Sequence, residues 1–242
     1  MGDLFSLRTE RVGLCEIVLG DSRLILDDLH RRTTATVTDP PYGISLKTNN
    51  AERGRGYSKE KNHPSNDFPL IVGDEQEFDP RPLLWRDPLS SEKERTVVLF
   101  GANWFARHLP PSGGWIVWDK LDGLTSKREM GFNDNSDCEL LWTNSGNCVR
   151  ILRHRWMGLL TGSEIGKKRV HPTQKPVELM ARIIEHWTTK DDIILDPYAG
   201  SGSTLVACQR LGRRCVGVEI ERAYWDICCR RVAEEIGRSK EI

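Results

Sequence analysis

The stretch Thr34-Ala35-Thr36-Val37-Thr38-Asp39-Pro40-Pro41-Tyr42 combines a short strand pattern with an unusual ending. Its first half is small, apolar and β-branched, which is typical of a buried strand. The two prolines then stiffen the backbone and leave carbonyl oxygens without local donors. Asp39 adds a carboxylate acceptor, and Tyr42 adds a flat ring with a polar tip. These groups suit a planar ligand that bears an exocyclic amino group, and a plain strand-end turn is the alternative from these residues alone.

The chain has 242 residues, enough for one sizeable domain or a domain with a small lobe. We expect one domain over 1–242, with long loop insertions at 43–79 and 121–135 and a small basic segment at 144–170. Basic and acidic residues balance at 35 each, so no overall field attracts nucleic acid. Residues 144–175 nevertheless hold seven basic residues and one acid, a net charge of +6. This local excess favours an anion-binding face, with a solvated polar loop as the alternative.

The cysteines and histidines form no pattern typical of a metal site or a disulfide framework. The seven cysteines include no Cys-x-x-Cys pair, and the six histidines are scattered. We therefore expect reduced thiols, no metal and a cytoplasmic location. No run of residues is apolar enough to predict a membrane span or a signal peptide.

Residues 193–219 read as a strand, a glycine turn, a helix, a second strand and an acid. Gly200 and Gly202 let the backbone approach a ligand closely, and the helix start offers unpaired N–H groups. Glu219 lies 19 residues beyond Gly200, where a strand end can accept hydrogen bonds from ribose hydroxyls. Leu205 stands where a dinucleotide fingerprint needs its third glycine. The pattern indicates an adenosine-containing cofactor, and a tight structural turn is the alternative.

Both motifs follow strands of what reads as an open α/β sheet. The expected strands cover residues 15–19, 34–39, 96–100, 115–118, 139–142, 193–195 and 214–220, and the expected main helices cover 22–32, 176–187, 204–211 and 222–236. Residues 148–156 suit a further strand or ribbon with one cationic side. Ligands of such sheets bind beyond the carboxyl ends of the strands, where the topology switches. If the strands before Asp39 and Gly200 are neighbours, one crevice holds both ligands.

Together these residues resemble the S-adenosylmethionine-dependent DNA amino-methyltransferases, in the permuted class whose target-amine motif precedes the cofactor motif. Residues 39–42 match the catalytic tetrapeptide of the family. Residues 196–202 match its aromatic-x-Gly-x-Gly turn, with Tyr198 where Phe is commoner. The resemblance implies a doubly wound, mostly parallel, seven-stranded α/β sheet, in which the strand ending at Asp196 lies between the strands ending at Glu219 and Asp39.

The resemblance also implies a role for each matched residue. The catalytic residues would be Asp39, Pro40, Pro41 and Tyr42. Those binding the cofactor S-adenosylmethionine would be Asp21, Asp39, Lys175, Asp196, Tyr198, Ala199, Gly200, Ser201, Gly202, Ser203, Thr204, Glu219 and Ile220. The basic segment matches nothing in the family, and there the DNA-binding candidates are Arg150, Arg153, Arg155, Lys167, Lys168 and Arg169.

The implied reaction is transfer of a methyl group to the exocyclic N6 of an adenine flipped out of double-stranded DNA. An acid at position 39 favours adenine N6 in this family, whereas cytosine-N4 enzymes more often carry Ser there. The implied setting is a restriction–modification system in the cytoplasm, encoded by a bacterium or a phage. The sequence leaves the oligomeric state open, a homodimer included.

Several alternatives stay open on the sequence alone. The chain could methylate cytosine N4, RNA or a protein side-chain amide, although glutamine methyltransferases carry Asn in place of Asp39. It could also be an inactive DNA-binding module with the same fold. A nicotinamide-dependent oxidoreductase is disfavoured by Leu205. Residues 43–79 read either as a flap over the substrate or as a disordered loop.

Overall fold

The structure, a computed structural model, describes seven stretches of the chain. They are residues 7–46, 71–84, 95–111, 114–122, 136–146, 148–156 and 170–239. The expected flap at 43–79 is therefore described at its two ends, and the expected loop at 121–135 is described only at 121–122. The basic candidates Lys167, Lys168 and Arg169 lie outside the described residues.

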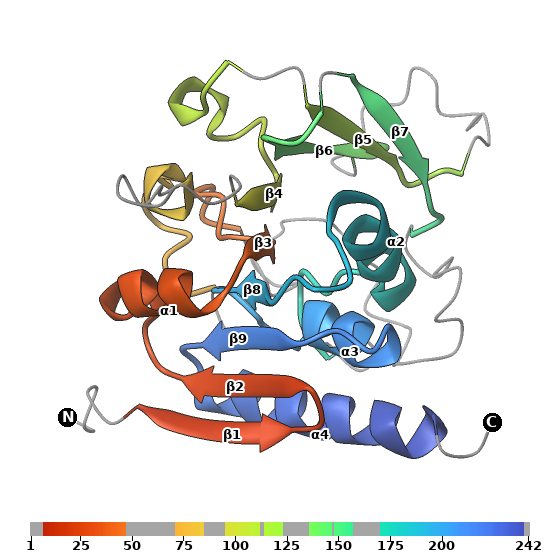
Figure 1. The fold of residues 1–242 in the computed structure, drawn as a ribbon. Coiled ribbons are helices and arrows are strands. Elements are labelled where there is room, and N and C mark those ends of the chain that lie inside the picture. Colours follow the sequence, from red (N-terminus) through yellow and green to blue (C-terminus); the bar gives the residue numbers. More distant parts are fainter. Residues whose placement is uncertain are drawn as a thin grey trace, which may run out of the picture.

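In the part of the chain that the structure describes, nine strands form one mixed sheet (Figure 1). In order across the sheet, the strands are β1 (Arg8–Val12), β2 (Cys15–Leu19), β9 (Cys215–Glu219), β8 (Ile194–Asp196), β3 (Ala35–Thr38), β4 (Thr96–Phe100), β6 (Cys138–Thr143), β5 (Trp115–Asp119) and β7 (Arg150–Arg153). The five strands from β2 to β4 are all parallel. The predicted position of β8, between β9 and β3, is confirmed.

Helices cover both faces of this sheet, as the doubly wound class predicts. On one face pack α2 (Val177–Trp187), α3 (Ser203–Arg210) and α4 (Arg222–Ser239), and on the other packs α1 (Leu26–Arg32), which follows the short 3-10 helix η1 (Ser22–Leu24) (Figure 1). Strand β4 has buried side chains on both faces of the sheet, so helices or loops must cover both faces. Val98 and Phe100 join the core cluster under α2, whereas Val97 and Leu99 join a second cluster on the opposite face. A parallel strand buried on both faces reads as a continuous apolar run.

Short elements complete the fold. Two 3-10 helices, η2 (Arg81–Leu84) and η3 (Ala106–His108), lie between the longer elements. The sequence of residues 103–108 suits a short helix, and η3 forms at its end. None of the helices in the described ranges is both long and apolar enough to cross a membrane.

Three features of the sheet differ from the prediction. There are nine strands rather than seven among the described residues, because β1 and β7 extend the two edges. Strand β1 gave no sequence signal, since its side chains are nearly all exposed and show no apolar alternation. The strands at 15–19 and 34–39, with the helix between them, predict a β-α-β unit whose strands pair by default. They do not pair, because β9 and β8 lie between β2 and β3. The strands β9, β8 and β3, which are buried at every residue, occupy the centre of the sheet.

The pairing of β3 with β8 brings the two sequence motifs together. Ala35 and Thr36 lie opposite Ile194 and Leu195 in parallel register, so both strands end at the same edge. There the Thr38 hydroxyl donates a 2.6 Å hydrogen bond to a carboxylate oxygen of Asp196. The loops that begin at residues 39 and 197 therefore start side by side.

Candidate active site

The loop after β3 holds its own aromatic residue against its own acid. The Tyr42 hydroxyl donates a 2.5 Å hydrogen bond to Oδ1 of Asp39. The Tyr42 ring lies against Gly101, which has a φ of +64°, and a Cβ at that position would overlap the ring. Glycine at the end of β4 therefore allows the close approach of Tyr42 to the sheet.

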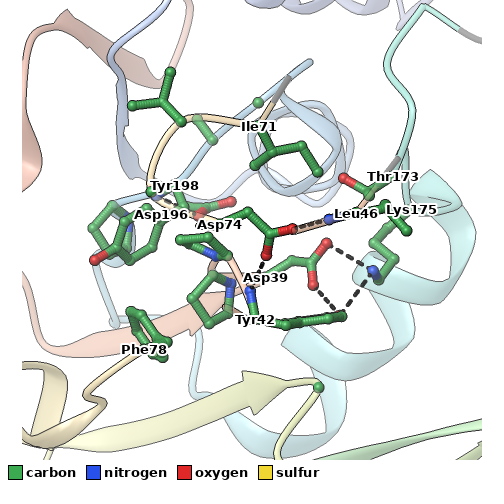
Figure 2. A pocket seen from close by; sticks show the side chains of 18 of the residues that line it. Asp39, Tyr42, Leu46, Ile71, Asp74, Phe78, Thr173, Lys175, Asp196 and Tyr198 are labelled. Carbon is green, nitrogen blue, oxygen red and sulfur yellow. Dashed lines mark hydrogen bonds and ion pairs between the residues drawn. The ribbon is translucent and has the colours of Figure 1, made fainter. Parts of the chain in front are cut away.

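Asp74, which the sequence did not single out, fixes the backbone of this loop. Its side chain is 4% exposed. One oxygen accepts the N–H groups of Tyr42 and Gly43, each at 2.9 Å, and the other accepts the N–H of Leu46 at 2.7 Å (Figure 2). A buried carboxylate that accepts several backbone hydrogen bonds is strongly held. The sequence around Asp74 gave no local signal for this role, since Asp74 binds residues about thirty positions earlier.

Phe78, which follows Asp74 closely in sequence, packs on the second motif. Its ring centroid lies 5.8 Å from that of Tyr198 and 5.2 Å from that of Phe105, both in edge-to-face geometry. Residues 71–79 thereby connect the loop after β3 with the loop after β8, as one wall of the site.

Lys175 reaches Asp39 from the turn before α2. Its Nζ lies 2.7 Å from Oδ2 of Asp39 and 3.3 Å from the Tyr42 hydroxyl (Figure 2). Burial, the largest influence, raises the pKa of Asp39 above its ordinary value, and the Lys175 ammonium opposes that rise. Burial lowers the pKa of Lys175, but the carboxylates of Asp39 and Glu139 outweigh it and raise that pKa overall. The lysine is therefore held as a cation.

The glycine turn after β8 is organised by Glu219 at the end of β9. The N–H of Gly200 donates to one oxygen of Glu219 at 2.8 Å, and the N–H of Glu221 donates to the other at 2.7 Å. Burial raises the pKa of Glu219 to about 7 and that of Asp196 to about 6. Gly202 has a φ of +81°, and a Cβ there would overlap Cys228 of α4. The turn is thus tight against both β9 and α4.

One cavity of about 1480 Å³ connects the two motifs. It is lined by all four residues of the loop after β3 and by every candidate cofactor residue except Gly202. Asp21 lines it too, but its carboxylate accepts hydrogen bonds from Arg23, at 2.6 Å from Nη2. The cavity also includes residues that the sequence reading missed, namely Asp74, Phe78, Lys120 and Glu139.

The basic candidates that the structure describes, Arg150, Arg153 and Arg155, are not among the residues that line the cavity. Arg150 and Arg153 are exposed on β7 at the edge of the sheet, and Arg155 is half-buried. The expected single cationic side is wrong: Arg150 and Arg153 are three positions apart in β7, and Leu152 is the buried residue of the strand. Alternation along the strand therefore places Arg150 and Arg153 on opposite faces.

Comparison with known proteins places these observations in a family context. A family model described as DNA methylase matches residues 156–230, which include the glycine turn and Glu219. The type II methyltransferase M2.DpnII of Streptococcus pneumoniae is 45% identical over 139 residues, which are 55% of this chain and 47% of that protein. M2.MboI of Moraxella bovis is 35% identical over 132 residues, 54% of this chain and 45% of that protein. The chain spans about half the length of the curated relatives it matches.

Solved structures extend the likeness to nearly the whole chain. The M1.HpyAVI–SAM complex has a TM-score of 0.51 at 21% identity and covers 90% of this chain and 98% of its own. The PvuII cytosine-N4-specific DNA methyltransferase has a TM-score of 0.55 at 13% identity and covers 96% of each chain. The chain shares its fold with the PvuII DNA methyltransferase. Within that fold, the motif order of the chain is the permuted one, with the loop after β3 preceding the glycine turn.

We expect the substitution Asp74→Ala to release the loop after β3. Losing hydrogen bonds to a charged acceptor costs about 1.5–3 kcal/mol each, so the amides of residues 42–46 should exchange with solvent roughly 10- to 100-fold faster. Hydrogen–deuterium exchange with mass spectrometry measures this directly. The control is Asp79→Ala, since Asp79 is in the same segment but pairs with Arg81. Unchanged exchange at 42–46 in the Asp74 variant would contradict the anchoring role.

Proposed function

We propose that this chain transfers a methyl group from S-adenosylmethionine to the exocyclic N6 of an adenine flipped out of double-stranded DNA. One observation carries the proposal. Asp39 and the Gly200–Glu219 pair line the same cavity, which is large enough for a cofactor and a base together. The sequence likeness to type II methyltransferases supports the same reading.

The residues beyond β8 and β9 fit the adenosine part of the cofactor. Glu219 ends β9 beside the glycine turn, where its carboxylate can accept hydrogen bonds from ribose hydroxyls. Asp39, Asp196 and Glu219 give the cavity an acidic lining that suits a positively charged sulfonium. The bound cofactor supplies a methyl group that is already activated for transfer.

The loop after β3 would prepare the target amine for attack. The amine lone pair is delocalised into the ring, so the amine is a poor nucleophile. Asp39 and the Pro40 carbonyl would accept its two N–H groups, which favours a pyramidal nitrogen and aims the lone pair at the methyl group. Tyr42 would stack on the base, whose flipping costs a few kcal/mol. The proton can leave after transfer, so Asp39 need not be a strong base.

Cytosine N4 is the second candidate target. The cytosine-N4-specific PvuII enzyme has the same fold as this chain, but at 13% sequence identity the similarity concerns the fold alone. Asp39 favours adenine as the target, because cytosine-N4 enzymes of the family that the chain resembles more often carry Ser at this position. RNA, a protein amide and a purely DNA-binding role are the remaining alternatives, and an assay of methylated products separates all of them.

We also propose a type II restriction–modification setting in the cytoplasm of a bacterial or phage-infected cell. Bacterial type II methyltransferases among the relatives support it. All seven cysteines are free, which suits a reducing compartment.

Purified protein incubated with labelled S-adenosylmethionine and unmethylated DNA should yield N6-methyladenine after nucleoside digestion. Asp39→Ala should lower kcat at least about 1000-fold, because it removes the acceptor that prepares the amine, while cofactor affinity stays within about threefold. Calorimetry measures the affinity. N4-methylcytosine as the sole product would overturn the assignment of adenine as the target base. Label found in RNA or protein would overturn the assignment of DNA as the substrate. A fully active Asp39 variant would overturn the catalytic role of Asp39.

We further propose that the basic segment meets DNA phosphates through Arg150, Arg153 and Arg155, with Lys167, Lys168 and Arg169 as sequence-based candidates. Replacing Arg150 and Arg153 with Ala should weaken DNA binding and reduce the salt slope of log K by about 1–2, since each phosphate contact contributes about 0.9. Fluorescence anisotropy across salt concentrations provides the slope. Arg11→Ala, at the far edge of the sheet, is the matched control. A slope that matches the parent protein would remove these arginines from the interface.

A further inference from the structure

The Lys175 ammonium occupies the place on Asp39 that a target amine would need. An ammonium has three N–H donors, and three oxygens face it. These are Oδ2 of Asp39 at 2.7 Å, the Tyr42 hydroxyl at 3.3 Å and Oε2 of Glu139 at 3.3 Å. Since Oδ1 of Asp39 accepts from Tyr42, both carboxylate oxygens are engaged before any base enters.

Glu139 on β6 offers the ammonium a second acceptor within the same cavity. Its Oε1 pairs with Lys120 of the turn after β5 at 2.6 Å. Its Oε2 is buried and, among the described residues, accepts no hydrogen bond, although it lies 3.3 Å from Lys175. That oxygen therefore has the capacity to accept an N–H of Lys175 at a shorter distance. A buried ammonium left without a partner would cost several kcal/mol.

We propose that Lys175 is a placeholder for the target amine and that Glu139 is the positioning residue that receives the ammonium when a base enters. The inference rests on the proposed function and deepens it. An N–H of the base replaces an N–H of Lys175 on Asp39, and the ammonium shortens its ion pair with Glu139. No proton changes hands, so the number of buried charges stays constant.

The exchange has a consequence for substrate choice. Among the four DNA bases, thymine alone has no exocyclic N–H to take over the hydrogen bond that Asp39 loses. A thymine would leave the buried Asp39 carboxylate with one acceptor unpaired, which costs about 1–3 kcal/mol or more. Lys175 thus adds discrimination in favour of amino bases.

The charge states support the exchange. Burial raises the pKa of Glu139, but the ammonium groups of Lys175 and Lys120 lower it overall, so Glu139 is a carboxylate at neutral pH. The receiving end of the proposed exchange is therefore charged, and at the other end the ammonium lies 2.7 Å from Oδ2 of Asp39.

Two single variants should shift DNA affinity in opposite directions. Glu139→Gln removes the receiving charge, so Lys175 stays on Asp39 and the KM for DNA should rise about tenfold. Lys120→Met removes the competitor for Glu139, so the KM for DNA should fall about threefold. The affinity for S-adenosylmethionine should stay unchanged in both. Damage to the fold does not tighten DNA binding, so a fall in KM with Lys120→Met distinguishes the exchange from a structural effect.

A double-variant cycle then tests whether Glu139 acts through Lys175. The readout is the Kd for DNA in the presence of sinefungin, a non-reactive cofactor analogue, because it needs no turnover. Glu139→Gln should raise this Kd about tenfold in the parent protein and leave it unchanged in a Lys175→Met background. Glu16→Gln on β2, at the opposite end of the strands, is the control and should have no effect.

The outcomes distinguish a failure of the placeholder role from a failure of the proposed function. A parent protein that transfers no methyl group to DNA overturns the proposed function. The placeholder role alone is overturned if the parent protein methylates DNA but Glu139→Gln raises the Kd equally in both backgrounds. It is also overturned if Glu139→Gln does not raise the Kd at all.

Discussion

The structure depends on the hydrogen bond between Thr38 and Asp196, two residues 158 positions apart. It joins the ends of the two central strands just where each enters a functional loop. The Asp196 carboxylate is buried, and it also accepts the N–H of Tyr198 at 3.2 Å. A hydrogen bond to a buried charged group contributes about 1.5–3 kcal/mol, and leaving that charge unpaired costs more. Removing this contact would therefore affect both loops at once.

A second constraint follows from placing so many carboxylates around one cavity. Asp39, Asp196 and Glu219 all have raised pKa values, with burial as the main cause. Each is stabilised differently: Asp39 by a buried lysine, Asp196 by a threonine hydroxyl and Glu219 by backbone N–H groups. Asp39 alone has a side-chain partner that can move away on a flexible stem. The group with the exchangeable partner is the one proposed to bind the target.

The sequence predicted the parts of this arrangement that are local in the chain. Proline-rich and glycine-rich turns at strand ends have short signatures, and the order of β9, β8 and β3 followed from the family resemblance. Asp74 and Glu139 were missed for a common reason. Each acts on residues far away in sequence, and nothing in its own neighbourhood distinguishes it from a surface acid.

The edges of the sheet were predicted least well. Strand β1 is exposed and has no apolar alternation, so only its pairing with β2 makes it a strand. Strand β7 was expected as a strand or ribbon, but its faces were not predicted correctly, since pairing with β5 leaves Leu152 buried and Ile151 exposed. Register at an edge is set by the neighbouring strand, and a shift of one residue exchanges the two faces.

The central claim is that the loops after β3 and β8 serve one reaction. A crystal structure of the protein with S-adenosylmethionine tests it most directly. We predict the ribose at Glu219, the cofactor backbone over Gly200, and the sulfonium methyl group directed towards Asp39. A cofactor bound elsewhere, or one whose methyl group points away from Asp39, would contradict the account.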